Sequence, residues 1–175
     1  MAIRILVFWW GLIVSGFSIS QDNGTSGYAI GSGDTIVISV YNEKDLFVRT
    51  QVDISGKVKF PLIGEIEVAN KTPSILEREI EAELFDGYLV NPDVSVMVEK
   101  YRPFYVKGAV KLPGAYEFRL NLTVEQAIAI GGGLRDRASK SSWYIVNGAD
   151  QVKHQVTKSD LVSPGDILHI EESIF

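Results

Sequence analysis

The amino-acid sequence predicts an α+β protein made of two small β-rich modules with one helix each. Most of the chain alternates apolar and polar residues in short runs, as at Ile36, Ile38 and Val40, which is typical of half-buried strands. Two segments instead place a capping threonine before apolar residues at helical spacing. The chain has 175 residues and is 46% hydrophobic, so it can form one ordinary domain or two small ones.

The first twenty residues have the pattern of a secretory signal peptide. Arg4 supplies the positive charge, residues 5–17 are largely apolar, and small residues precede a cleavage site between Ser20 and Gln21. An uncleaved anchor is the alternative, but the apolar stretch is shorter than the roughly 20 residues that span a bilayer. We therefore expect residues 1–20 to be removed and the protein to be exported.

The first module is expected over residues 28–102, after a polar leader at residues 21–27. Gly33 and Asp34 form a turn that starts its first strand, Thr35–Tyr41. The further strands expected in this module are Phe47–Ile54, Lys57–Pro61, Glu65–Val68 and Asp93–Tyr101.

One helix is expected in the first module, with Thr72 as N-cap and Pro73 at its first position. It is expected to end near Asp86 and Gly87. Its apolar face comprises Ile75, Leu76, Ile80 and Leu84, and its solvated face comprises Glu77, Glu79, Glu81 and Glu83. A glycosidase needs two carboxylates across a cleft, so acids along one helix do not favour catalysis.

The second module is expected over residues 103–175 and begins with a hairpin. Pro113 and Gly114 form its turn, between strands at Phe104–Val110 and Ala115–Arg119, and we expect a positive φ at Gly114.

A short helix capped by Thr123 follows the hairpin, with Gln126 placed to complete a capping box. The helix is expected to end on the glycines at residues 131–133 through a left-handed exit, rather than to bind phosphate, because a phosphate loop precedes its helix. Gly165 and Asp166 repeat the Gly-Asp turn of the first module. The remaining expected strands are Trp143–Val146, Gln151–Thr157 and Asp166–Glu171.

Both halves resemble modules of the bacterial polysaccharide biosynthesis/export family, the outer-membrane polysaccharide exporters. The second half resembles the soluble-ligand-binding β-grasp (SLBB) motif, V-x-G-x-V-x-x-P-G followed by T-x-x-x-A-I and G-G. The residues that carry this likeness are Gly108, Pro113, Gly114, Thr123 and Gly132. The first half resembles the polysaccharide export domain through Gly33, Asp34, Pro61 and Gly64. The resemblance implies a β-grasp fold for the second module.

The resemblance also implies a non-enzymatic role and a set of partners. Subunits of this family form an oligomeric ring through which a capsular or exopolysaccharide chain passes. The usual partner is an inner-membrane polysaccharide co-polymerase, and a member of the short class would need a separate outer-membrane β-barrel. Many members are lipoproteins, but this sequence has no cysteine, so we expect association with the outer membrane through partners.

Composition argues against several other functions. The net charge of −5 and the absence of a basic face exclude a nucleic-acid partner. With no cysteine and two histidines, the sequence predicts no metal site and no cofactor.

Aromatic side chains suggest a second interpretation, a monomeric periplasmic glycan-binding module. Tyr101, Tyr116, Trp143 and Tyr144 could stack on sugar rings, although places in a core or an interface are favoured for each. A carbohydrate-active enzyme is the third and weakest interpretation.

Overall fold

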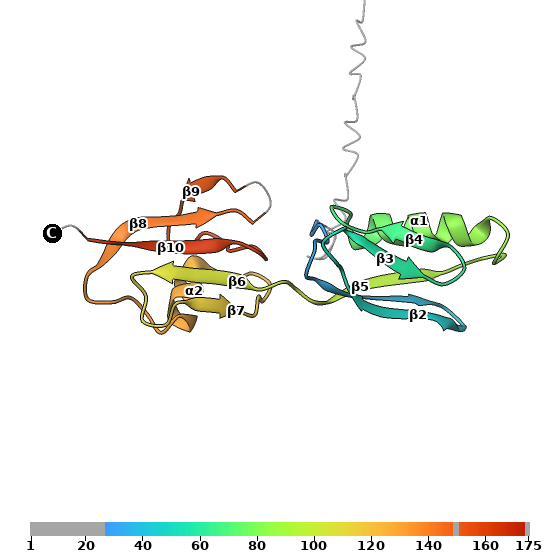
Figure 1. Cartoon of the computed structure of the whole chain (residues 1–175), viewed down its shortest axis with the longest axis horizontal. Coiled ribbons are helices and arrows are strands. Elements are labelled where there is room, and N and C mark those ends of the chain that lie inside the picture. The colour runs from blue at the N-terminus through green and yellow to red at the C-terminus, as the bar shows by residue number, and fades with distance from the viewer. Residues whose placement is uncertain (1–26, 149–150, 174–175) are drawn as a thin grey trace, which may run out of the picture.

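The computed structural model describes residues 27–148 and 151–173, and Figure 1 shows two groups of strands joined end to end. The expected signal peptide, with its cleavage between Ser20 and Gln21, lies outside the described residues. The elements are β1 (Thr35–Val40), β2 (Glu43–Gln51), β3 (Lys57–Phe60), β4 (Gly64–Glu67), α1 (Pro73–Phe85), β5 (Val94–Lys100), β6 (Phe104–Gly108), β7 (Gly114–Tyr116), α2 (Val124–Ile130), β8 (Ala138–Val146), β9 (Lys153–Gln155) and β10 (Ile167–Glu172). The predicted α+β class is confirmed.

The first group consists of an antiparallel sheet in the order β2-β1-β5, a β3-β4 hairpin and α1. The predicted alternation in β1 is confirmed, because Ile36, Ile38 and Val40 are buried. Thr72 caps α1 and Pro73 occupies its first turn, as predicted. Ile75, however, is exposed, so the buried face is narrower than expected and comprises Pro73, Leu76, Ile80 and Leu84.

Strand β2 begins and ends earlier than the predicted Phe47–Ile54. Asn42 takes a left-handed φ of 61° and turns the chain directly from β1 into β2. At the other end, the carboxylate of Asp53 accepts hydrogen bonds from the Ser55 amide and hydroxyl. This local turn ends the strand, because Asp and Ser side chains compete with the neighbouring strand for hydrogen bonds to backbone groups.

Two carboxylates of α1 that the sequence assigned to a solvated face instead close the free edge of β5. Glu77 Oε1 accepts the Val96 amide at 2.9 Å, and Glu81 Oε1 accepts the Val94 amide at 3.1 Å. The prediction was wrong for these two residues because helical periodicity does not reveal a strand edge beside the helix. The bonds prevent these amides of β5 from pairing with another strand.

The second group is a five-stranded sheet in the order β7-β6-β10-β8-β9, in which β6 and β10 run parallel. Its core includes Phe104, Leu168 and Ile170, which are fully buried. The predicted capping box of α2 is confirmed between Thr123 and Gln126. The glycine exit is confirmed as well, although the left-handed residues are Gly132 and Gly133, while Gly131 keeps a φ of −71°.

The hairpin of the second group differs from the predicted Pro-Gly turn. Gly108 has a φ of +89° and ends β6 before the predicted Val110. The chain then detours to residues 131–134, where the Lys111 amide donates to the Gly133 carbonyl at 3.0 Å. Gly114 has no positive φ and starts β7 opposite Val106, so that expectation was wrong.

The last strands also differ in length from the prediction. β8 starts at Ala138, five residues before the predicted start at Trp143. β9 is limited to Lys153–Gln155. Within residues 27–148 and 151–173, no helix is long and apolar enough to cross a membrane.

Candidate functional site

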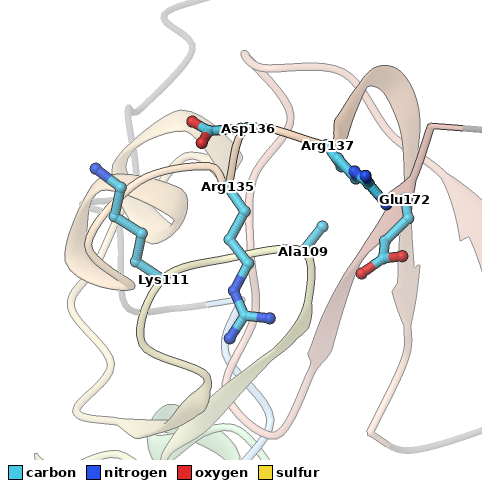
Figure 2. A pocket seen from close by; sticks show the side chains of 6 residues that line it. All are labelled: Ala109, Lys111, Arg135, Asp136, Arg137 and Glu172. Atoms are coloured by element: carbon cyan, nitrogen blue, oxygen red, sulfur yellow. The ribbon is translucent and has the colours of Figure 1, made fainter. Parts of the chain in front are cut away.

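A hollow of about 520 Å³ in the second group is surrounded by charged side chains (Figure 2). It lies where the segment after β6, the segment between α2 and β8, and the end of β10 meet. Its lining residues are Ala109, Lys111, Arg135, Asp136, Arg137 and Glu172. Three cations and two acids therefore surround one opening.

A second concentration of charge lies between the two groups, at the two Gly-Asp turns. Asp34 and Asp166 are 0% and 4% exposed, and they are the buried charged residues of the described part of the chain. Each follows a glycine with positive φ, +94° and +87° respectively. The Asp34 carboxylate accepts the Gly31 amide and the Asp166 carboxylate accepts the Ser163 amide, each at 2.8 Å. The predicted repetition of one turn is confirmed.

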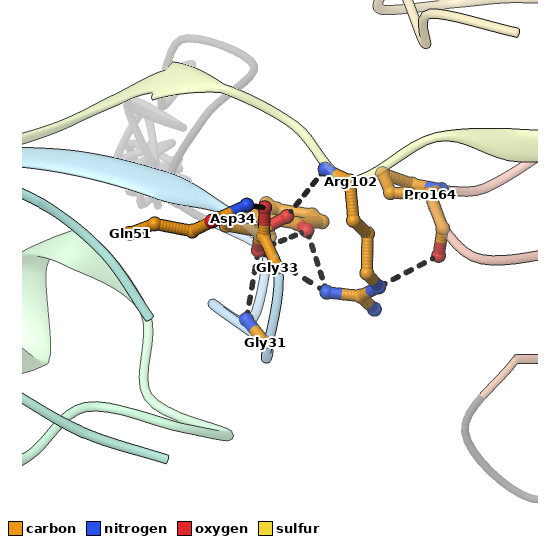
Figure 3. Close-up of polar contacts among 7 residues, drawn as sticks. Gly31, Gly33, Asp34, Gln51, Arg102 and Pro164 are labelled. Atoms are coloured by element: carbon orange, nitrogen blue, oxygen red, sulfur yellow. Dashed lines mark hydrogen bonds and ion pairs between the residues drawn. The ribbon is translucent and has the colours of Figure 1, made fainter. Parts of the chain in front are cut away.

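Arg102, in the chain between β5 and β6, binds both groups at once (Figure 3). Its amide donates to Asp34 Oδ1 at 2.7 Å, and its Nη1 forms an ion pair with Asp34 Oδ2 at 3.1 Å. Its Nε donates to the carbonyl of Pro164, beside the second turn, at 3.1 Å. We call this arrangement of Asp34, Arg102 and Pro164 the joint.

Glycines leave the space that the guanidinium occupies. A Cβ at Gly31 would lie 2.1 Å from Arg102 Nη1, and one at Gly165 would lie 2.9 Å from Arg102 Nε. A side chain at either position would therefore displace the guanidinium from its place. The small residues of the two turns therefore allow one arginine to fill the gap between them.

Tyrosines cover the joint. The Tyr28 hydroxyl donates to Asp34 Oδ2 at 2.6 Å and accepts from Arg102 Nη1 at 2.9 Å. Burial raises the pKa of Tyr28, and the hydrogen bond to Asp34 raises it further. Tyr101 packs edge-on against Tyr28 at 4.9 Å and against Phe118 of the second group at 5.4 Å. Burial also raises the pKa of Tyr101.

The joint is built for rigidity. Asp34 accepts four hydrogen bonds, one on Oδ1 from the Arg102 amide and three on Oδ2 from the Gly31 amide, the Tyr28 hydroxyl and Arg102 Nη1. The backbone adds a bond from the Gly165 amide to the Pro103 carbonyl at 3.0 Å.

The aromatic residues predicted as weak glycan contacts have separate surroundings. Tyr101 lies in the joint, and the Tyr116 hydroxyl donates to the Leu112 carbonyl. Trp143 is 3% exposed and its indole donates to Ser139, which makes it a core residue. Tyr144 lies under the ammonium group of Lys153, 3.7 Å from the ring centre.

Sequence reasoning missed Arg102, which it treated as part of a boundary, and the cations of the hollow. An arginine directly before a proline, at the border of two segments that each contain a Gly-Asp turn before a strand, was the available signal. No cluster of three metal-ligating side chains occurs among residues 27–148 and 151–173.

The fold and the joint define a class of tandem-module α+β proteins in which one arginine pairs with a buried aspartate of the first group and also donates to a backbone carbonyl of the second. Residues 22–99 match the family model described as polysaccharide biosynthesis/export protein, and residues 103–153 match the SLBB domain. The chain belongs to the polysaccharide biosynthesis/export family.

Curated relatives carry names that agree with this family. The exopolysaccharide production protein ExoF of Rhizobium meliloti is 33% identical over 59% of this chain and 26% of its own length. The EPS I polysaccharide export outer membrane protein EpsA of Ralstonia solanacearum is 27% identical over 82% of this chain and 48% of its own. The polysialic acid transport protein KpsD of Escherichia coli is 23% identical over 85% of this chain and 28% of its own length. The chain thus spans less than half the length of these relatives.

Proposed function

We propose that the protein is an exported, non-enzymatic component of a system that secretes a capsular or exopolysaccharide. The observation that carries this proposal is the tandem match of an export module and an SLBB module in one chain. The names of the relatives support it, because each refers to production, export or transport of a polysaccharide.

We further propose that the export module occupies residues 28–102 and the SLBB module residues 103–175. Two separate hydrophobic clusters support this division. One lies among residues 30–96 and the other among residues 104–170. Arg102 and Pro103 stand between them, at the joint.

In this proposal, identical copies assemble into a ring around the path of the polymer. The joint supports it, because a closed ring requires every subunit to present its contact surfaces at one fixed angle. The ring would act in the periplasm and would be held near the outer membrane by partners. These partners would be an inner-membrane polysaccharide co-polymerase and a separate outer-membrane β-barrel.

Deletion of the gene in its native host tests the export role. Secreted polysaccharide, quantified in the medium and on the cell surface, is expected to disappear and to return when the full chain is supplied from a plasmid. Secretion at the original level in the deletion strain would contradict the role.

Native mass spectrometry of the purified full chain tests the ring. Several copies per particle are expected. A strictly monomeric protein that restores secretion would contradict the ring and would favour a monomeric glycan-binding module.

A further inference from the structure

The hollow of Figure 2 has a firmly held frame. The Arg135 amide donates to the Ala109 carbonyl at 3.0 Å, and the Ser173 amide donates to the Arg137 carbonyl at 2.7 Å. An isolated bridge also joins Val110 to Leu134. The three segments that carry the charged side chains are thus fixed to one another through their backbones, and the volume of about 520 Å³ falls within the range of small-molecule sites.

The charge of the hollow is opposite to that of the chain. The sequence has 17 basic and 22 acidic residues, a net charge of −5, whereas the hollow combines Lys111, Arg135 and Arg137 with Asp136 and Glu172, a net charge of +1. In the described part of the chain, none of the three cations takes part in any of the six ion pairs. Their charges are therefore available to an anion.

The residue types also suit a particular kind of anion. A guanidinium holds a carboxylate through two parallel hydrogen bonds and stays charged at every physiological pH. Asp136 and Glu172 are acceptors for hydroxyl groups. In Figure 2 the Arg135 guanidinium lies between and below the carboxylates of Asp136 and Glu172, with Lys111 on one side and Arg137 on the other, so a ligand with both carboxylate and hydroxyl groups meets complementary partners.

We propose that this hollow binds acidic sugar units of a polysaccharide, with sugar carboxylates bound at Arg135, Arg137 and Lys111 and sugar hydroxyl groups donating to Asp136 and Glu172. The inference rests on the proposed export function, because it specifies the chemical class of the polymer, a polysaccharide that contains carboxylate-bearing sugars.

Calorimetric titration of the purified full chain with a galacturonate oligosaccharide tests the site. Binding is expected at low salt and is expected to weaken as salt rises, because the contacts are ionic. A neutral maltose oligosaccharide of equal length is expected to bind at least tenfold more weakly. Equal affinity for both oligosaccharides, or no binding of the acidic one at low salt, would overturn the proposal.

A charge-matched pair of variants separates the site from the general charge of the protein. R135Q/R137Q is expected to lower the affinity for the galacturonate oligosaccharide at least tenfold. K57Q/K59Q removes two exposed lysines from β3 in the other module and is expected to change the affinity less than twofold. An equal loss in both variants would overturn the proposal, and thermal unfolding checks that both are folded.

Titration of the wild-type chain with inorganic phosphate is expected to show binding at least tenfold weaker than that of the galacturonate oligosaccharide. Phosphate binding as tight as that of the oligosaccharide would overturn the assignment to acidic sugars.

Secretion in the native host distinguishes this inference from the function on which it rests. If the wild-type chain restores secretion in the deletion strain and R135Q/R137Q restores it fully, the export role stands and the acidic-sugar site is refuted. If the wild-type chain has no effect because secretion never depended on it, the export role itself fails.

Discussion

The two Gly-Asp turns are alike in backbone and different in use. Both place a buried aspartate after a left-handed glycine and before a strand. The Asp34 carboxylate accepts hydrogen bonds from the guanidinium and from the backbone amide of Arg102. At the second turn, the guanidinium of Arg102 donates instead to the backbone carbonyl of Pro164. Asp166 accepts amides of Gly148 and Ser163, both within the second group.

This difference shows how one local motif can serve two levels of structure. In the first module the carboxylate stabilises the contact between modules, and in the second it stabilises a loop. The first side of the joint thus depends on charge, and the second side depends on the position of the backbone. Substitutions on each side of the joint test this division.

The largest effect is expected from replacing the first aspartate. Asp34→Ala removes the partner of a largely buried arginine and leaves amides and the Tyr28 hydroxyl without an acceptor, so the free energy of unfolding should fall by about 3–5 kcal/mol. Asp166→Ala should cost about 1–3 kcal/mol. Urea unfolding of both variants measures the difference. Equal losses would contradict the unequal roles of the two turns.

A backbone substitution tests the second module next. A Cβ at Gly108 would lie 2.0 Å from the Ile170 carbonyl oxygen, and its φ of +89° adds strain. Gly108→Ala should therefore cost at least about 1–3 kcal/mol. Gly114→Ala, where the nearest atom is 3.9 Å away, should stay within about 0.5 kcal/mol of the wild type. A larger effect at Gly114 in thermal unfolding would restore the tight-turn interpretation.

Arg102→Ala should change the orientation of the two modules relative to each other as well as the free energy of unfolding. Loss of its charged hydrogen bonds should cost about 1.5–3 kcal/mol, and the two modules should gain freedom relative to each other. Small-angle scattering should then show a broader range of shapes, while hydrogen exchange within each core stays close to that of the wild type. Arg102→Lys, which retains the charge without the planar fork, should recover only part of the rigidity. An unchanged scattering profile for Arg102→Ala would show that the aromatic contacts alone hold the joint.

High pH should weaken the joint through Tyr28. Because the pKa of Tyr28 is raised in the folded chain, the unfolded chain loses this proton first, and stability is present below about pH 10 and falls above it. Tyr28→Phe should reduce this pH dependence in urea titrations. A slope equal to that of the wild type would mean that other groups cause it.

The smallest effect is expected from amide substitutions on α1. Glu77→Gln keeps an oxygen that can accept the Val96 amide, so unfolding should change by less than about 0.5 kcal/mol and secretion should stay nearly intact. Glu77→Ala removes the acceptor and should cost about 1 kcal/mol. Glu83→Ala, on the exposed face, serves as the control. Loss of secretion by Glu77→Gln with an unchanged fold would point to a catalytic acid.

Most elements of this chain were predictable because their signals are local. The caps at Thr72 and Thr123 and the alternation in β1 depend on neighbours within a few residues. The predictions failed where a segment far along the chain forms hydrogen bonds with the predicted element. Glu77 bonds to a strand 19 positions away, and the hairpin after Gly108 widens because residues 131–134 pair with it.

The sequence by itself determined the α+β class, the two Gly-Asp turns, the caps of both helices and the residues that resemble an export protein. Only the tertiary structure decided that Arg102 joins the two sheets and that Lys111, Arg135 and Arg137 surround one hollow. The physical reason is separation along the chain. Arg102 and Asp34 are 68 positions apart, and their ion pair forms only after β1 and β5 have paired, which places Thr35 opposite Lys100.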